Sequence, residues 1–147
     1  MTLIYALLAV AAGALLPVQA GVNASLRLSL QNPVLATVAN FIVGLSLLVA
    51  YAVATRIPAP SLAQVAQTPW WCWIGGPMGA ALVLSGVLIS HRLGAATFIG
   101  CIILGQLAAS VALDHFGLVG YPQHSLTFPR LAGLLLLAAG VYLIRRS

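Results

Sequence analysis

Long apolar runs, separated by short polar or proline-containing stretches, dominate this sequence. The runs cover approximately residues 2–26, 34–55, 69–90, 94–114 and 128–144. An α-helix needs about 20 residues to cross the roughly 30 Å hydrocarbon core of a bilayer, and each run has about this length. The runs together fill most of the chain. The sequence therefore predicts an all-α membrane protein with five transmembrane helices in a single transmembrane domain, residues 1–147.

The stretches between the runs contain residues that begin or end helices. Asn32-Pro33 precedes the second run and Pro69 opens the third, and proline fits the first turn of a helix. Residues 57–68 and 115–127 are expected to be loops, the second being the most polar part of the chain. Residues 91–94 leave room only for a very short turn between the third and fourth runs.

The first run also has the outline of a cleavable signal peptide, because Val18-Gln19-Ala20 looks like a small-residue cleavage site. However, no Lys or Arg precedes the run, and Gly13 and Pro17 interrupt it, which is atypical of a signal peptide. We therefore expect this segment to remain as the first transmembrane helix.

Composition agrees with a membrane location. Of the 147 residues, 62% are hydrophobic and 5% are charged, and the mean hydropathy is +1.10. Soluble domains carry about a quarter charged residues. The net charge of +5 comes from six arginines against one acid. These arginines flank the apolar runs and form no basic stripe, which argues against a nucleic-acid partner and is typical of anchors at lipid headgroups.

The arginines also bear on orientation. The side of the membrane that holds the N-terminus has Arg56 and Arg130, whereas the opposite side has Arg27, Arg92, Arg145 and Arg146. The positive-inside rule favours a cytoplasmic C-terminus. The positive charge of the amino terminus, on the side with fewer arginines, reduces this difference in charge further. The remaining difference is small enough to permit insertion in both orientations.

Four amide side chains lie within the predicted spans. Gln19 and Asn23 are four residues apart and share one face of the first helix, Asn40 is in the second helix and Gln106 in the fourth. In lipid such groups must find a partner or line a wet cavity. Two interpretations remain open: the amides bind a polar substrate, or they form hydrogen bonds between helices.

Three residues are expected to shape the backbone. Pro17 removes a backbone hydrogen bond next to Gln19 and can kink the first helix, a feature of transporter midplane sites. Gly75 and Gly79 form a small-xxx-small pair in the third helix, which allows two helix backbones to approach closely. We interpret the glycine pair as a packing device and not as a ligand site.

Titratable groups are scarce. Gln106, Ser110 and Asp114 form a stripe with a spacing of four along the fourth helix, which is either a substrate path or a packing seam. Asp114, the only acid, precedes His115, and these two are the candidates for proton coupling. Their position at the helix end is equally typical of a solvated cap. No acid lies at mid-membrane, so the embedded carboxylate that would bind a lipophilic cation is missing.

Enzyme chemistry finds little support. The chain has no paired carboxylates, no HExxH motif and no phosphate-binding glycine loop. His91 is predicted to lie on the opposite side of the membrane from His115 and His124, so one subunit cannot gather the three around a metal ion. The sequence therefore predicts no enzyme activity, no cofactor and no metal site.

Five motifs in order resemble a known family. They are Gly13–Asn23, Pro69–Trp71, Arg92–Thr97, Gly105–Leu107 and Asp114–Leu118. Together they are similar to the YdcZ-like family, a five-helix branch of the drug/metabolite transporter superfamily. The resemblance implies a multi-pass protein of the bacterial inner membrane. Larger relatives have ten helices in two inverted halves, so the resemblance implies that a free half assembles as an antiparallel dimer.

These observations predict a small-solute transporter that works by alternating access. It would be an antiparallel homodimer, or a heterodimer with a sibling chain, and its partners would otherwise be the bilayer and the solute. The substrate would be polar and neutral or anionic, bound at the dimer interface by Gln19, Asn23, Asn40 and Gln106. Two alternatives remain: a non-transporting scaffold or regulatory subunit, in which the amides only stabilise the fold, and a passive channel.

Overall fold

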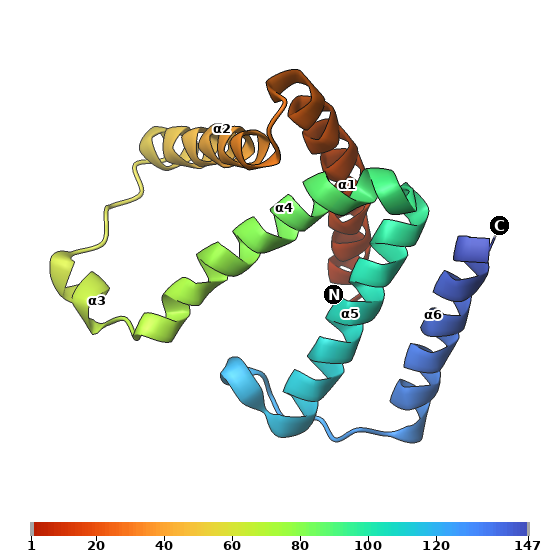
Figure 1. Ribbon diagram of the computed structural model, residues 1–147. Helices are drawn as coiled ribbons and strands as arrows, with labels where there is room; N and C mark the ends of the chain where they lie inside the picture. Colours follow the sequence, from red (N-terminus) through yellow and green to blue (C-terminus); the bar gives the residue numbers. More distant parts are fainter. Residues whose placement is uncertain (1, 147) are drawn as a thin grey trace. The chain divides into compact units, whose positions relative to one another are not determined.

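A computed structural model describes residues 2–146 of the chain (Figure 1). Every regular element in this range is helical, as the sequence predicts. The elements are α1 (Thr2–Leu30), α2 (Pro33–Ala54), α3 (Leu62–Gln67), the 3₁₀ helix η1 (Trp70–Ile74), α4 (Gly75–Leu93), α5 (Ala95–Phe116), the 3₁₀ turn η2 (Leu118–Gly120) and α6 (Phe128–Arg146).

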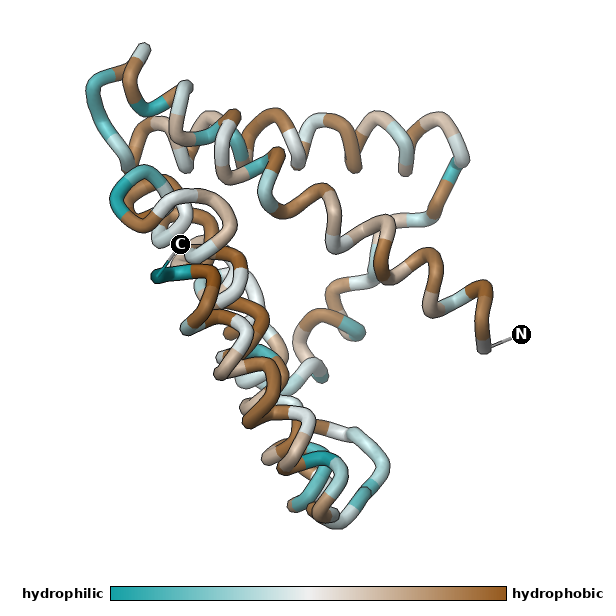
Figure 2. Tube along the Cα trace, turned by 90° about the vertical axis from the view of Figure 1, so that its right-hand side faces the viewer, coloured by the Kyte–Doolittle hydropathy of each residue, from teal (hydrophilic) through white to brown (hydrophobic). Residues whose placement is uncertain are grey.

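Five of these segments are long and apolar enough to cross a membrane, which confirms the predicted number. They are Leu3–Leu30, Pro33–Ala54, Trp70–Leu93, Ala95–Phe116 and Phe128–Arg146. Hydrophobic residues follow the helices around much of their circumference, whereas hydrophilic residues collect mainly at the helix ends and connections (Figure 2). This distribution is the one expected when lipid surrounds the helices and water meets only their ends.

Helix α1 is longer than the sequence pattern indicates. It continues through Pro17 and ends at Leu30, four residues beyond the expected end near residue 26. The Ser25 hydroxyl donates to the Gly21 carbonyl at 3.1 Å, and the Ser29 hydroxyl donates to the Ser25 carbonyl at 3.4 Å. Because these hydroxyls bond the preceding turn, serines at the end of the run do not interrupt the helix.

Helix α2 has well-defined ends. At its N-terminus the Asn32 side chain accepts hydrogen bonds from the backbone N–H groups of Val34 and Leu35, at 2.9 and 3.1 Å. At its C-terminus Arg56 adopts a left-handed conformation with φ of 54°, and the Ile57 N–H donates to the Ala52 carbonyl at 2.9 Å. This is the bond pattern of a Schellman cap, so the chain turns at Arg56 before it reaches the two prolines.

The expected loop 57–68 contains the short helix α3. The Ser61 hydroxyl accepts from the Gln64 N–H at 3.3 Å, and the Gln64 side chain accepts from the Ser61 N–H at 2.8 Å. Such a capping box satisfies two backbone donors at a helix start. The Ser-x-x-Gln spacing is the sequence signal for this helix.

The third span begins as a 3₁₀ helix. Pro69 is the N-cap of η1, and α4 starts only at Gly75. The expected turn at residues 91–94 is shorter than predicted, because α4 extends to Leu93 and a single residue, Gly94 with φ of 78°, separates it from α5. Glycine tolerates this backbone conformation, which other residues rarely adopt.

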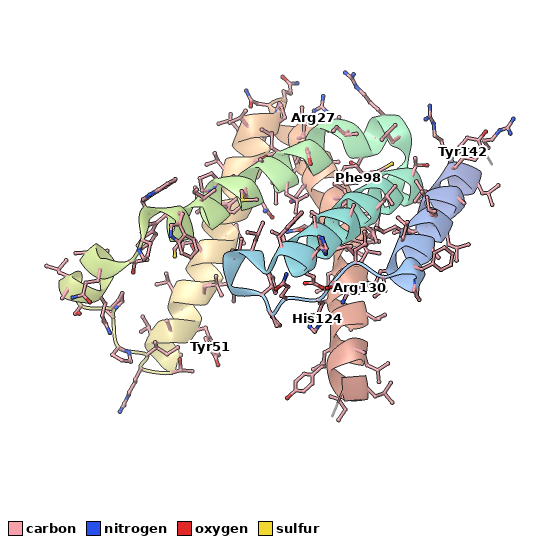
Figure 3. All side chains as sticks on the ribbon, turned by 90° about the horizontal axis from the view of Figure 1, so that it is seen from below. Arg27, Tyr51, Phe98, His124, Arg130 and Tyr142 are labelled. Atoms are coloured by element: carbon pink, nitrogen blue, oxygen red, sulfur yellow. The ribbon has the colours of Figure 1, made fainter. Side chains whose placement is uncertain are left out.

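The helices form two compact units, one up to Arg92 and the other from Leu93 onward. In the first unit α1 packs against α2, and its most buried residues include Asn23, Ala24, Ala36 and Val87. A hydrogen bond of 3.1 Å from Arg27 Nη1 to the Val87 carbonyl oxygen connects α1 to α4. Arg27 is labelled in Figure 3.

In the second unit α5 and α6 pack side by side and run antiparallel (Figure 1). Their closest approach includes Gly100 and Val141. A Cβ atom at Gly100 would lie 3.0 Å from Val141 Cγ2, so a larger residue would require the valine side chain to shift. Val141 is one of the buried residues of this unit.

Most of the helix surface remains uncovered. In each of the five spans no more than 11% of the most apolar 18-residue window is buried within the chain. Large apolar side chains therefore face outward along every span, and in a membrane these faces meet either lipid or another protein chain.

Candidate functional site

The first unit contains an open groove that brings two of the predicted amides together. Gln19 from α1 and Asn40 from α2 both line it, and Gly79 from α4 lies on its wall. The groove has a volume of about 660 Å³, within the usual range for small-molecule sites. Its complete lining is Gln19, Asn40, Phe41, Val43, Gly44, Leu45, Leu48, Gly79, Leu82 and Val83.

The chemistry of this groove is simple. Seven of the ten lining residues, all except Gln19, Asn40 and Phe41, are aliphatic or glycine, and Phe41 is aromatic. Each amide offers two N–H donors and one carbonyl acceptor. The groove can therefore hydrogen-bond a polar, uncharged group or accept an anion through its amide N–H groups. None of its lining residues carries a charge.

The structure separates the two amides of α1, although they lie four residues apart. Gln19 is exposed and lines the groove, whereas Asn23 is only 3% exposed and lies next to the fully buried Ala24. Asn23 therefore belongs to the packed part of the unit and not to the groove lining.

The remaining predicted site residues do not join the groove, except for Gly79. Gln106 is exposed on α5, in the second unit. A Cβ atom at either Gly75 or Gly79 would meet no atom within 4 Å. Within the first unit there is thus room beside both glycines, and at Gly79 this room is part of the groove.

A second polar site closes the α5–α6 hairpin. Asp114, in the last turn of α5, pairs with Arg130 in the first turn of α6, with 3.3 Å between Oδ2 and Nη1. Arg130 Nη1 also donates to the His124 carbonyl at 3.3 Å, and the His124 N–H donates to the Asp114 carbonyl at 2.7 Å. Figure 3 shows Arg130 and His124 close together. The pair joins both helices to the connecting loop.

His115 is also hydrogen-bonded to the same loop. Its Nδ1 accepts a hydrogen bond of 3.1 Å from the Leu126 N–H, and its backbone carbonyl accepts one of 3.0 Å from Gln123 Nε2. The His115 and Phe116 rings meet edge to face, with centroids 4.8 Å apart.

A small pocket of about 320 Å³ lies beside the ion pair. Its lining is Leu107, Ser110, Val111, Asp114, Arg130 and Gly133. The sequence-based expectation for Arg130 concerned orientation alone, and its pairing with Asp114 was not predicted. A signal was present, because the only acid and Arg130 lie in terminal turns of consecutive helices that share one loop.

The residues from 2 to 146 contain no group of three or more His, Cys, Asp and Glu side chains placed to hold a metal ion. Cys72 and Cys101 are both free and exposed. Two of the pockets in the described chain have polar side chains in their lining: the amide groove in the first unit and the Asp114–Arg130 pocket in the second.

Comparison with known proteins agrees with the resemblance found in the sequence. The family model described as "Putative inner membrane exporter, YdcZ" matches residues 4–143. The "Inner membrane protein YdcZ" of Escherichia coli (strain K12) is 33% identical over 82 residues, which are 56% of this chain and 54% of that protein. The match thus spans about half of this curated relative. No solved structure matches the chain significantly.

Proposed function

This chain belongs to the YdcZ family of inner-membrane proteins, and we propose on that premise that it forms one half of a small-solute transporter. The observation that carries the proposal is the open groove in which Gln19 of α1 and Asn40 of α2 face one apolar cavity. The family description names an exporter, and a groove with two convergent amides is a suitable place for a polar solute to be held during export.

An antiparallel second copy would complete the groove. The sides of all five spans are largely uncovered, and the Gly75–Gly79 face has no close neighbour in the described chain. Small residues allow the backbone of a second helix to approach, and van der Waals contact between close helices drives association in lipid. The weak arginine bias permits both orientations, so two copies of one chain can meet head to tail. Rocking of the two halves about the groove would then alternate access.

The groove favours a polar solute that is neutral or anionic. Amide N–H groups bind carboxylate or hydroxyl oxygens, and the amide oxygens bind hydroxyl or amine hydrogens. No acid lines the groove, and the only acid of the sequence is paired with Arg130. An organic cation would therefore lack a countercharge in a low-dielectric site, which is costly.

The proposal can be tested by counterflow in proteoliposomes. Radiolabelled glucose, serine and succinate serve as neutral, zwitterionic and anionic probes, and liposomes without protein give the background. We expect saturable uptake of at least one probe, and a loss of about tenfold or more in Gln19→Leu and Asn40→Leu, in line with about 1.4 kcal/mol per lost hydrogen bond. Gln67→Leu, an exposed position on α3 outside the groove, is the matched control.

The outcomes separate the alternatives. If the leucine variants unfold more easily while no probe shows saturable flux even with the wild-type chain, the protein is a scaffold or regulatory subunit. Flux that rises linearly with probe concentration indicates a channel. Thermal unfolding of each reconstituted variant distinguishes loss of binding from loss of structure.

A further inference from the structure

We propose that Arg130 and Asp114 form a proton-linked anion site, which binds a small carboxylate together with one proton. This site is separate from the amide groove, and the proposal does not depend on transport through that groove. Its parts are the guanidinium of Arg130, the carboxyl of Asp114 and the pocket of about 320 Å³ beside them.

The resting ion pair is one that a ligand can displace. Arg130 and Asp114 meet at a single contact of 3.3 Å, and their side chains are 34% and 29% exposed. Ion pairs as exposed as this contribute little to stability, because water screens the charges. Exchange of the Asp114 carboxylate for a carboxylate from solution therefore costs little.

Arg130 has donors available for a ligand. A guanidinium carries five N–H donors in a planar fork. The contacts found among the described residues, to Asp114 Oδ2 and to the His124 carbonyl, both involve Nη1. The fork can thus bind a planar carboxylate through two parallel hydrogen bonds, which is its preferred arrangement.

The pocket selects the rest of the ligand. Leu107, Val111 and Gly133 give it an apolar wall, and Ser110 contributes a hydroxyl. Its volume is at the lower end of the range for small-molecule sites, about 300–1,000 Å³. A short, branched monocarboxylate therefore fits, with its carboxylate on Arg130 and its hydrocarbon tail against Leu107 and Val111.

Charge balance links binding to a proton. Arg130 and ionised Asp114 sum to zero, so a bound anion leaves one excess negative charge and two carboxylates beside one guanidinium. A second carboxylate in the same site disfavours the charged form of the first, so binding of the anion favours uptake of a proton. The anion and the proton then bind together: Asp114 becomes a neutral acid while Arg130 keeps the ligand carboxylate.

The neighbouring titratable groups are few. His124 is in the loop, and its backbone contacts both Arg130 and Asp114. His115 is on the same helix as Asp114, and its Nδ1 is engaged by the Leu126 N–H. Neither imidazole makes a described contact with the Asp114 carboxylate, whose described charged partner is Arg130.

The test uses the full chain in lipid nanodiscs and equilibrium dialysis with radiolabelled isobutyrate, with empty nanodiscs as the blank. Linkage of one proton to the bound anion raises the dissociation constant about tenfold per pH unit, and the constant is measured between about pH 6 and about pH 8. We expect this slope for the wild-type chain and for His124→Gln, which removes the imidazole but keeps the backbone contacts. The neutral isostere isobutyramide should not displace the label.

Two variants distinguish the anion-binding role of Arg130 from the proton-binding role of Asp114. Arg130→Gln should abolish binding, whereas Asp114→Asn should bind isobutyrate with no dependence on pH across this range. Calorimetry of the wild-type chain in two buffers that differ in ionisation enthalpy should count about one proton per anion, and this measurement holds even if a variant fails to fold. Binding that survives Arg130→Gln, a slope that survives Asp114→Asn, or no binding to the folded wild-type chain would overturn the proposal.

Discussion

Arg27 Nη1 lies 3.1 Å from the carbonyl oxygen of Val87, so the last turns of α1 are hydrogen-bonded to α4, 60 residues later in the chain. Val87 is fully buried, and Arg27 is half-buried. The sequence analysis placed Arg27 at the membrane boundary as an anchor. In the structure the same guanidinium also connects two spanning helices, because its long side chain reaches from α1 to the Val87 carbonyl of α4.

Replacing Arg27 with Gln should destabilise the first unit. The variant loses a charge-assisted hydrogen bond to a backbone carbonyl, which typically contributes about 1.5–3 kcal/mol. We expect a lower unfolding midpoint in denaturant titrations of the detergent-solubilised protein. Arg92→Gln removes an arginine that is exposed at the end of α4, and it should leave the midpoint nearly unchanged. Equal losses in both variants would mean that the loss of positive charge, and not the Val87 contact, sets the stability.

Replacing Gly100 with Ala should weaken the α5–α6 hairpin. The new Cβ would lie 3.0 Å from Val141 Cγ2, and the β-branched valine has little rotamer freedom to move away. Overpacking of this kind costs about 1–3 kcal/mol. The double variant Gly100→Ala with Val141→Ala should recover part of the loss, since the second change removes the clashing methyl groups. Thermal unfolding followed by circular dichroism measures all three proteins.

A matched control lies on the same helix. A Cβ atom at Gly105 would meet no atom within 4 Å, so Gly105→Ala should be neutral or stabilising within this subunit. If Gly105→Ala were as damaging as Gly100→Ala, the cause would be a contact outside the described chain, such as a second copy, and not the Val141 contact.

Replacing Asn32 with Ala should destabilise α2 by about 1 kcal/mol, the usual cost of losing an N-cap. The side-chain oxygen of Asn32 accepts from two backbone N–H groups, those of Val34 and Leu35. Asn32→Ser should retain most of the stability because a serine hydroxyl can accept the same bonds. Hydrogen exchange at the start of α2 is the appropriate measurement, and unchanged protection in Asn32→Ala would show that the cap contributes nothing.

The chain should insert in both orientations. Cysteines at Ala63, on the side of Arg56, and at Ser147, next to Arg146, are introduced into a background in which Cys72 and Cys101 are replaced by Ala. An impermeant thiol reagent applied to intact cells should then label each site to about half, because the arginine bias between the two sides is small. Full labelling at one site and none at the other would show a single orientation and would remove the basis for an antiparallel homodimer.

The number and position of the spans follow from the sequence because both depend on local properties. A run of about 20 apolar residues is a transmembrane helix whatever its neighbours are. Helix starts are similarly local: Asn32-Pro33 predicts the start of α2, and Ser61 with Gln64 carries a capping box that identifies α3 even though the sequence analysis expected a loop there. The family also followed from short motifs, and the comparison confirmed it.

Tertiary structure decided which polar residues share a site. Helical spacing placed Gln19 and Asn23 on one face, but packing buries Asn23 and leaves Gln19 in a groove with Asn40. Likewise, the sequence puts Asp114 and Arg130 at the two ends of one loop, but only the fold of the loop brings their side chains to 3.3 Å. The physical reason is that these helices are apolar around most of their circumference. Lipid and helix surfaces are then nearly equivalent neighbours for an apolar side chain, so the hydrophobic pattern fixes each helix but not the face that it turns toward another.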